Sequence, residues 1–272
     1  MTALLGCDFS SSPTTKKPIV MAWGSESRNV VRLERFQFIN RLEDFSRALQ
    51  TPGPWVGGFD LPFGLPRELI QSLGWPLKWI DCMAHYSQLT RQQIRDHFAS
   101  FCDSRPVGQK FAHRQTDRPA SSSPSMKWVN PPVAYMLHAG VPLMIEARLH
   151  FPGLHVGDKT RVALEAYPGM LARHFLSNQS YKSDGRKKQT QERLIARKNL
   201  IHGLESGIPH LNLRLKLSNA QRDTLVDDPK GDLLDAVLCM VQAAWADQRS
   251  DQNYGMPSNI DSIEGWIVTA PQ

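Results

Sequence analysis

Five carboxylates lie far apart along the chain in positions typical of a metal site. Asp8, Asp60 and Glu165 each follow a run of apolar residues that has the composition of a buried strand. Asp232 and Asp235 lie three residues apart in a long apolar segment. Because a buried carboxylate is costly unless it is paired or bound to a metal ion, we predict that the five acids converge. Oxygen ligands favour Mg²⁺ or Mn²⁺.

The segment that holds Asp232 and Asp235 is apolar on most faces, which predicts a largely buried helix over residues 230–247. One interpretation makes the two acids a capping pair at the start of this helix. However, Asp228 followed by Pro229 is a stronger signature of the N-cap and first helical positions. The two acids are then expected inside the helix, one turn apart on the same face.

The other three acids also have structural interpretations. Asp8 and Asp60 are residue types common in turns. Glu165 is a candidate for a buried ion pair with Arg161 or Arg173. Each of these alternatives accounts for one acid, whereas a shared metal site accounts for all of them.

The composition is that of a soluble globular enzyme, with 272 residues of which 41% are hydrophobic and 21% charged. No apolar run reaches the length of about 18 residues typical of a membrane span, and the N-terminus lacks a leader pattern. The four cysteines and nine histidines show no spacing typical of zinc sites or disulfide frameworks. We therefore expect a soluble, cytoplasmic protein without a membrane partner.

The net charge of +6 is compatible with a polyanionic partner, although such a surplus is also common in other proteins. Its distribution is more informative, because many basic residues fall in one stretch that begins as a loop and continues as a helix. This stretch either contacts phosphate or is a solvated face. Its basic residues are Lys182, Arg186, Lys187, Lys188, Arg193, Arg197 and Lys198.

The first sixty residues predict an antiparallel meander followed by a helical crossover. The expected elements are strands over residues 3–9, 19–23 and 30–38, a helix over 41–49 and a strand ending at residue 60. The alternation of strands and helices is then interrupted over residues 67–159, which we interpret as an insertion of helices and loops. The core resumes with a strand over 161–166 and helices over 169–176, 190–204 and 230–247.

Several short segments together form a recognisable series. They are residues 6–10 (GCDFS), 60–66 (DLPFGLP), 114–118 (RQTDR), 165–169 (EAYPG), 232–236 (DLLDA) and 264–267 (EGWI). In this order they resemble the ribonuclease H-like superfamily and, within it, the domain of unknown function 429 family of predicted nucleases. The resemblance covers most of the chain.

The resemblance implies an α/β fold with a five-stranded mixed sheet, whose first three strands are antiparallel, flanked by helices. It also implies a single domain over residues 1–272, with a core of about 1–66 and 160–272 and an insertion of about 67–159. As in RuvC-type resolvases, the first strand, the fourth strand and a late helix carry the acids. Glu165 on the fifth strand is an addition to the usual set, so it is either a ligand or a residue that orients one.

By the same resemblance, the protein is expected to be a nuclease that uses two Mg²⁺ or Mn²⁺ ions about 4 Å apart to hydrolyse phosphodiesters by attack of water. Asp8 would bridge both ions, and Asp60 and Asp235 would each hold one. Asp232 or Glu165 would complete the ligand set.

Basic residues are expected to bind the phosphates of the substrate. Arg114, Arg118 and Lys182 are the candidates, with Asp117 orienting one of the arginines. Surface ion pairing is the alternative role for all of them. DNA, RNA and small nucleotides remain open as substrates, and the sequence does not indicate an oligomeric state.

Two other function classes are consistent with this fold. Nucleotide-binding ATPases and phosphotransferases share the architecture, but the chain has neither a duplicated domain nor a Gly-rich phosphate loop. A noncatalytic nucleic-acid-binding protein would use the acids for structure alone. Intact activity after Asp8→Asn would favour that second alternative.

Overall fold

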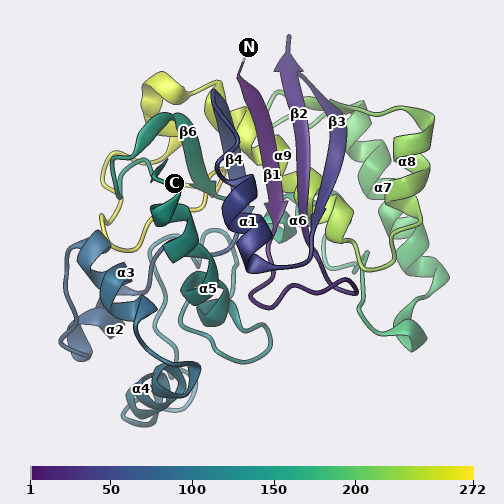
Figure 1. Cartoon of the computed structure of the whole chain (residues 1–272). Coiled ribbons are helices and arrows are strands. Elements are labelled where there is room, and N and C mark those ends of the chain that lie inside the picture. Colours follow the sequence, from purple (N-terminus) through teal and green to yellow (C-terminus); the bar gives the residue numbers. More distant parts are fainter. Residues whose placement is uncertain (1) are drawn as a thin grey trace.

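A computed structural model describes residues 2–272, which form an α/β fold around one mixed sheet (Figure 1). The strands are β1 (Ala3–Asp8), β2 (Ile19–Ser27), β3 (Val30–Ile39), β4 (Trp55–Asp60), β5 (Leu149–His150), β6 (Asp158–Glu165) and β7 (Arg214–Lys216). The helices are α1 (Leu42–Ala48), α2 (Arg67–Ser72), α3 (Trp79–Ser87), α4 (Arg91–Asp103), α5 (Val133–Glu146), α6 (Pro168–Leu176), α7 (Gln191–Ser206), α8 (Asn219–Val226) and α9 (Asp232–Asp247). Two short 3-10 helices, η1 (Arg186–Lys188) and η2 (Ser250–Gly255), complete the elements.

The sheet has seven strands in the order β5-β6-β4-β1-β2-β3-β7. Strands β1, β2 and β3 form the expected antiparallel meander, and β4 and β6 run parallel to β1. The expected count of five is wrong because β5 and β7 extend the two edges. These edge strands contain two and three residues, which is too short for an alternating hydrophobic pattern to reveal them.

Side chains on the two faces of β1 belong to two separate hydrophobic clusters. Leu5 and Cys7 pack with α1 and with helices α3, α4 and α5. Leu4 points to the opposite face and packs with α6, α7 and α9. This alternation along a strand places helices on both sides of the sheet, as Figure 1 shows.

The segment expected as an insertion, residues 67–159, holds α2 to α5 and the edge strand β5. Its buried side chains, including Trp79, Phe98 and Leu137, belong to the same hydrophobic cluster as Leu5 and Phe59 of the sheet. The segment therefore shares its core with the sheet. No helix within residues 2–272 combines the length and apolar character that crossing a membrane requires.

Helix α9 lies directly against the sheet at two glycines that are neighbours in the register, Gly6 of β1 and Gly58 of β4. A Cβ atom on Gly6 would lie 1.9 Å from the carbonyl oxygen of Ala236, and one on Gly58 would lie 2.4 Å from that of Cys239. Neither position has room for a side chain. The two glycines thus allow the helix backbone to touch the strands.

Helix α9 begins at Asp232, slightly later than the predicted start. Its N-cap is Gly231, which has a φ of 76°, so the predicted N-cap at Asp228 is wrong. Asp228 still supports the helix start, because its carboxylate accepts hydrogen bonds from the backbone N–H groups of Lys230 at 3.1 Å and Leu233 at 2.9 Å. Asp232 and Asp235 both lie in the first turn.

Candidate metal site

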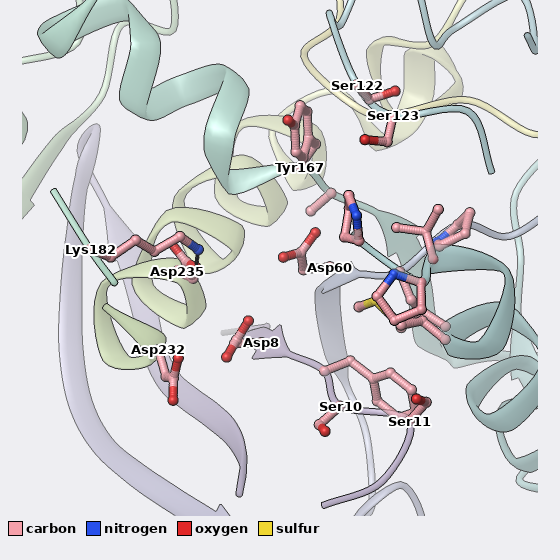
Figure 2. Close-up of a pocket in the computed structure, with 18 of the residues that line it drawn as sticks. Asp8, Ser10, Ser11, Asp60, Ser122, Ser123, Tyr167, Lys182, Asp232 and Asp235 are labelled. Atoms are coloured by element: carbon pink, nitrogen blue, oxygen red, sulfur yellow. Dashed lines mark hydrogen bonds and ion pairs between the residues drawn. The ribbon is translucent and has the colours of Figure 1, made fainter. Parts of the chain in front are cut away.

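Three of the five predicted acids converge where β1, β4 and α9 meet. Asp8, Asp60 and Asp235 each offer one carboxylate oxygen, and these three oxygens lie within 4.8 Å of one another. Figure 2 shows the three side chains directed toward a common point. Within the described residues, this is the group of acids that is compact enough to hold one ion.

The backbone places these acids together in two steps. Asp8 and Asp60 are direct neighbours in the parallel β1–β4 register, both at the carboxyl end of their strand. The contact of α9 with Gly6 and Gly58 then brings the first turn of the helix, which carries Asp235, to the same end of the sheet. Close helix packing is therefore a condition for the third acid to join the other two.

The carboxylates of this site resist full ionisation. Burial, followed by the charges of Asp235 and Asp60, raises the pKa of Asp8 well above its usual value. Burial and the charge of Asp235 raise the pKa of Asp60 to about 7. A divalent cation would relieve this repulsion, so the three carboxylates could hold a metal ion.

Asp235 is 1% exposed and has two cationic or polar partners in addition to the neighbouring acids. The Tyr181 hydroxyl donates to one carboxylate oxygen, and the Lys182 ammonium donates to the other. Burial alone would lower the pKa of Lys182, but the charges of Asp235 and Asp8 raise it above its usual value, so the lysine is charged. Lys182, predicted to contact phosphate, thus lies in the site but binds an acid.

Asp232 lines the same cavity but lies outside the group of three oxygens. Its side chain is partly buried, beside Asp8 in Figure 2. Burial, Asp228 and Asp235 raise its pKa to about 6. The structure therefore places Asp232 at the margin of the site.

Glu165 lines the same cavity but lies outside the group of three oxygens and is bound by an arginine. Arg114 donates to both of its carboxylate oxygens, at 2.6 and 2.8 Å, and the backbone N–H of Phe63 donates at 2.9 Å. The expectation that Glu165 is a metal ligand is not supported by this geometry, because both oxygens are already used. The ion-pair alternative holds with a different partner from the predicted Arg161 or Arg173.

The predicted phosphate contact at Arg114 also needs correction. Arg114 is 3% exposed, and its guanidinium binds Asp117 as well as Glu165, so it has no free face for a phosphate. Asp117 is buried and orients Arg114, which is the kind of role expected for it. Arg118 is exposed on the surface outside the cavity lining, and its contact with a flanking phosphate stays a prediction.

The basic stretch predicted for phosphate contact or a solvated face divides into different roles. Arg197 is 5% exposed and donates to the carbonyl oxygens of Val226 at 2.8 Å and Tyr181 at 2.9 Å, so it is structural. Lys187, Lys188 and Lys198 are exposed, and Arg193 is partly buried. The side chain of Arg186 lies outside the part of the chain that the structure describes.

The acids line a cavity of about 580 Å³ whose wall also carries hydroxyl and ammonium groups. Sequence reasoning missed these groups, since isolated serines and lysines in loops form no recognisable pattern. Figure 2 shows Ser10 and Ser11 on one side of the cavity and Ser122, Ser123 and Tyr167 on another. The polar lining residues outside the predicted set are Ser10, Ser11, Lys17, Ser122, Ser123, Tyr167, Ser180, Ser183, Asp184 and Lys230.

The lining of the cavity contains carboxylates as well as lysine ammonium and hydroxyl groups. Clustered carboxylates bind hard divalent cations, and lysines with hydroxyl groups bind phosphate oxygens. Comparison of the chain with protein families, with curated proteins and with solved structures finds no match. The cavity thus combines carboxylates that could hold a cation with ammonium and hydroxyl groups that can bind an anion.

Proposed function

We propose that the protein is a Mg²⁺- or Mn²⁺-dependent nuclease of the ribonuclease H-like type that hydrolyses phosphodiester bonds. The observation that carries the proposal is the convergence of Asp8, Asp60 and Asp235 from two strands and a late helix. The five longer strands support it, since an antiparallel meander joined to parallel strands is the arrangement that the sequence resemblance implies.

Asp8, Asp60 and Asp235 would hold the metal. A divalent ion at such a site activates water and offsets the charge of the phosphate. The cavity wall contributes binding: Lys17 and Lys230 lie at its lining and add positive potential, which attracts a polyanion.

The size of the cavity bears on the substrate. A volume of about 580 Å³ lies within the range of roughly 300–1,000 Å³ typical of pockets for small ligands. It can hold one nucleotide unit, either free or as part of a DNA or RNA strand. We therefore include nucleoside triphosphates beside nucleic acids as candidate substrates, which also tests for a nucleotide-hydrolysing enzyme of the same fold.

The state of the cysteines is relevant to where such an enzyme would work. Cys7, Cys82, Cys102 and Cys239 are buried free thiols. Free thiols suit a reducing compartment, so we propose that the nuclease is cytoplasmic.

Cleavage assays test the proposal directly. Labelled single-stranded, duplex and branched DNA and RNA, together with nucleoside triphosphates, are incubated with Mn²⁺ or EDTA. We expect cleavage of at least one substrate, with Mn²⁺ only. In Asp8→Asn and Asp235→Asn we expect the cleavage rate to fall by about 100-fold or more, because replacing residues that only orient a metal ligand already lowers activity by about 10–100-fold.

Asp251→Asn is the matched control, because it makes the same substitution at an exposed carboxylate in η2. It should cleave as the wild type does. Cleavage that persists in EDTA, or that survives both active-site substitutions, would contradict the proposal. Binding of nucleic acid without cleavage of any substrate, and without a metal-induced rise in melting temperature, would favour a noncatalytic binding protein.

A further inference from the structure

Lys182 extends from the loop between α6 and α7 into the group of acids. Its ammonium binds Asp235, whose other oxygen accepts the hydroxyl of Tyr181. The lysine stem is partly exposed, with 42% of the side chain accessible, whereas Asp235 is 1% exposed. Figure 2 shows the cationic end of the side chain beside the carboxylate of Asp235.

The surrounding fold fixes this lysine in place. Arg197 of α7 donates to the carbonyl oxygen of Tyr181 at 2.9 Å, and the N–H of Ser183 donates to that of Pro229 at 3.1 Å. On the other side, a Cβ atom on Gly231 would lie 2.8 Å from the Cβ of Lys182. Gly231, the N-cap of α9, therefore packs against the lysine that binds Asp235.

While Lys182 occupies one carboxylate oxygen of Asp235, the ligands that remain are too few for two ions. A pair of ions about 4 Å apart needs a bridging carboxylate and further ligands for each ion. Glu165 is occupied by Arg114, and Asp232 lies outside the group of three oxygens. One Mg²⁺ or Mn²⁺ ion, which retains several water ligands, is satisfied by a few carboxylates.

The charges of the acids and of Lys182 also indicate one divalent ion per site. Asp8, Asp60 and Asp235 carry three negative charges when ionised, and Lys182 offsets one of them. Within this group of three acids, which leaves out Asp232 at the margin of the site, one divalent ion balances the remaining two. The other lysines of the wall bind elsewhere: Lys17 pairs with Asp184 at 3.1 Å, and Lys230 donates to the backbone carbonyl of Lys16.

We propose that Lys182 occupies the position of the second cation, so that the chain binds one divalent ion per site. The inference rests on the proposed metal-dependent function and replaces its expected second ion by an ammonium group. Lys182 then contributes to holding Asp235 in place.

The number of bound ions tests this inference without an activity assay. Isothermal titration of the full-length protein with Mn²⁺ should give one ion per chain. Electron paramagnetic resonance with two equivalents of Mn²⁺ should show no exchange-coupled pair. In Lys182→Met, we expect two ions per chain and a coupled signal, because the place of the ammonium is free for a metal ion.

Lys230→Met is the matched control, because it removes a cavity lysine whose ammonium binds a backbone carbonyl. It should keep one ion per chain. Two ions with a coupled signal in the wild type would overturn the inference and leave the nuclease proposal intact. A single ion in a folded Lys182→Met would also overturn the inference. No bound ion in the wild type would overturn both proposals.

A melting experiment covers the possibility that Lys182→Met is too unstable for titration. In EDTA, the variant should melt below the wild type, since three carboxylates lose their counter-ion, and Mn²⁺ should raise its melting temperature by more than it raises that of the wild type. An equal metal-induced rise in both proteins would count against the inference.

Discussion

Glu165 is a buried carboxylate whose hydrogen bonds are satisfied by protein groups. Arg114 binds both of its oxygens, and Phe63 donates its backbone N–H to one of them. Because Phe63 lies three residues after Asp60, the contact fixes the loop that follows a proposed metal ligand. Glu165 therefore links the loop after β4, the end of β6 and the Arg114 segment.

We predict that Glu165→Gln destabilises the fold and leaves metal binding unchanged. Breaking a buried ion pair costs about 3–5 kcal/mol, and we expect a loss at the lower end of this range because Arg114 keeps Asp117 as a partner. Urea unfolding measures the loss, and titration with Mn²⁺ measures the affinity. Glu68→Gln, which breaks a more exposed pair with Arg105, should cost about 1 kcal/mol or less. A variant of wild-type stability that no longer binds Mn²⁺ would instead identify Glu165 as a ligand.

At the scale of elements, the contact between α9 and the β1–β4 pair decides whether a site forms. Gly6 and Gly58 are neighbours in register, and the helix backbone occupies the space above both. Asp235 comes from the first turn of α9 and the two strand acids from the ends of β1 and β4. A shift of the helix would therefore separate Asp235 from Asp8 and Asp60.

Gly6→Ala should destabilise the protein and weaken its metal binding. The new methyl group would lie 1.9 Å from the Ala236 carbonyl oxygen, so the helix must move away. Overpacking of this kind costs about 1–3 kcal/mol. Gly185→Ala is the control, since its nearest neighbour would lie at an ordinary 3.6 Å. Melting curves and Mn²⁺ titrations check both variants, and unchanged Mn²⁺ affinity in Gly6→Ala would contradict the role given to this contact.

At the scale of the whole molecule, the site gathers residues from both ends of the chain and from the segment between them. The acids come from β1, β4 and α9, and the cavity wall adds Ser122 and Ser123 from the insertion. Concentrating carboxylates in one place stores repulsion in the metal-free protein. Folding stability must then depend on pH and on metal.

The sign of this dependence follows from Asp60. Its pKa is about 7 in the folded protein and 3.8 as the ordinary value, so the folded state favours the protonated carboxyl. This contribution to stability is present below pH 4 and is lost as the pH rises to about 7. In EDTA at pH 8, Asp60→Asn should therefore be more stable than the wild type, on the order of 2 kcal/mol after allowance for partial exposure.

Unfolding experiments between pH 4 and pH 8 measure the difference in the free energy of unfolding between the wild type and Asp60→Asn. The difference should be small at pH 4 and complete above pH 7. Saturating Mn²⁺ should reverse it at pH 8, because only the wild type has the full ligand set. A difference that does not change with pH would show that Asp60 ionises freely in the folded protein.

Local patterns in the sequence were sufficient for much of the architecture. The antiparallel meander, β4, β6 and the buried helix carrying Asp235 all have hydrophobic periodicity that depends on residues close together in the chain. The ends of these elements also marked Asp8, Asp60 and Asp235 as candidates. The edge strands β5 and β7 were missed because two or three residues carry no period.

Only the tertiary structure decided which charged groups are partners. Arg114 lies 51 residues before Glu165, and Lys182 lies 53 residues before Asp235, and no local pattern links either pair. Residue type and spacing determined that acids would stand at the ends of buried elements. Whether an acid is left for a metal ion or paired with a cation depends on which distant segments pack beside it, and packing is a property of the folded chain.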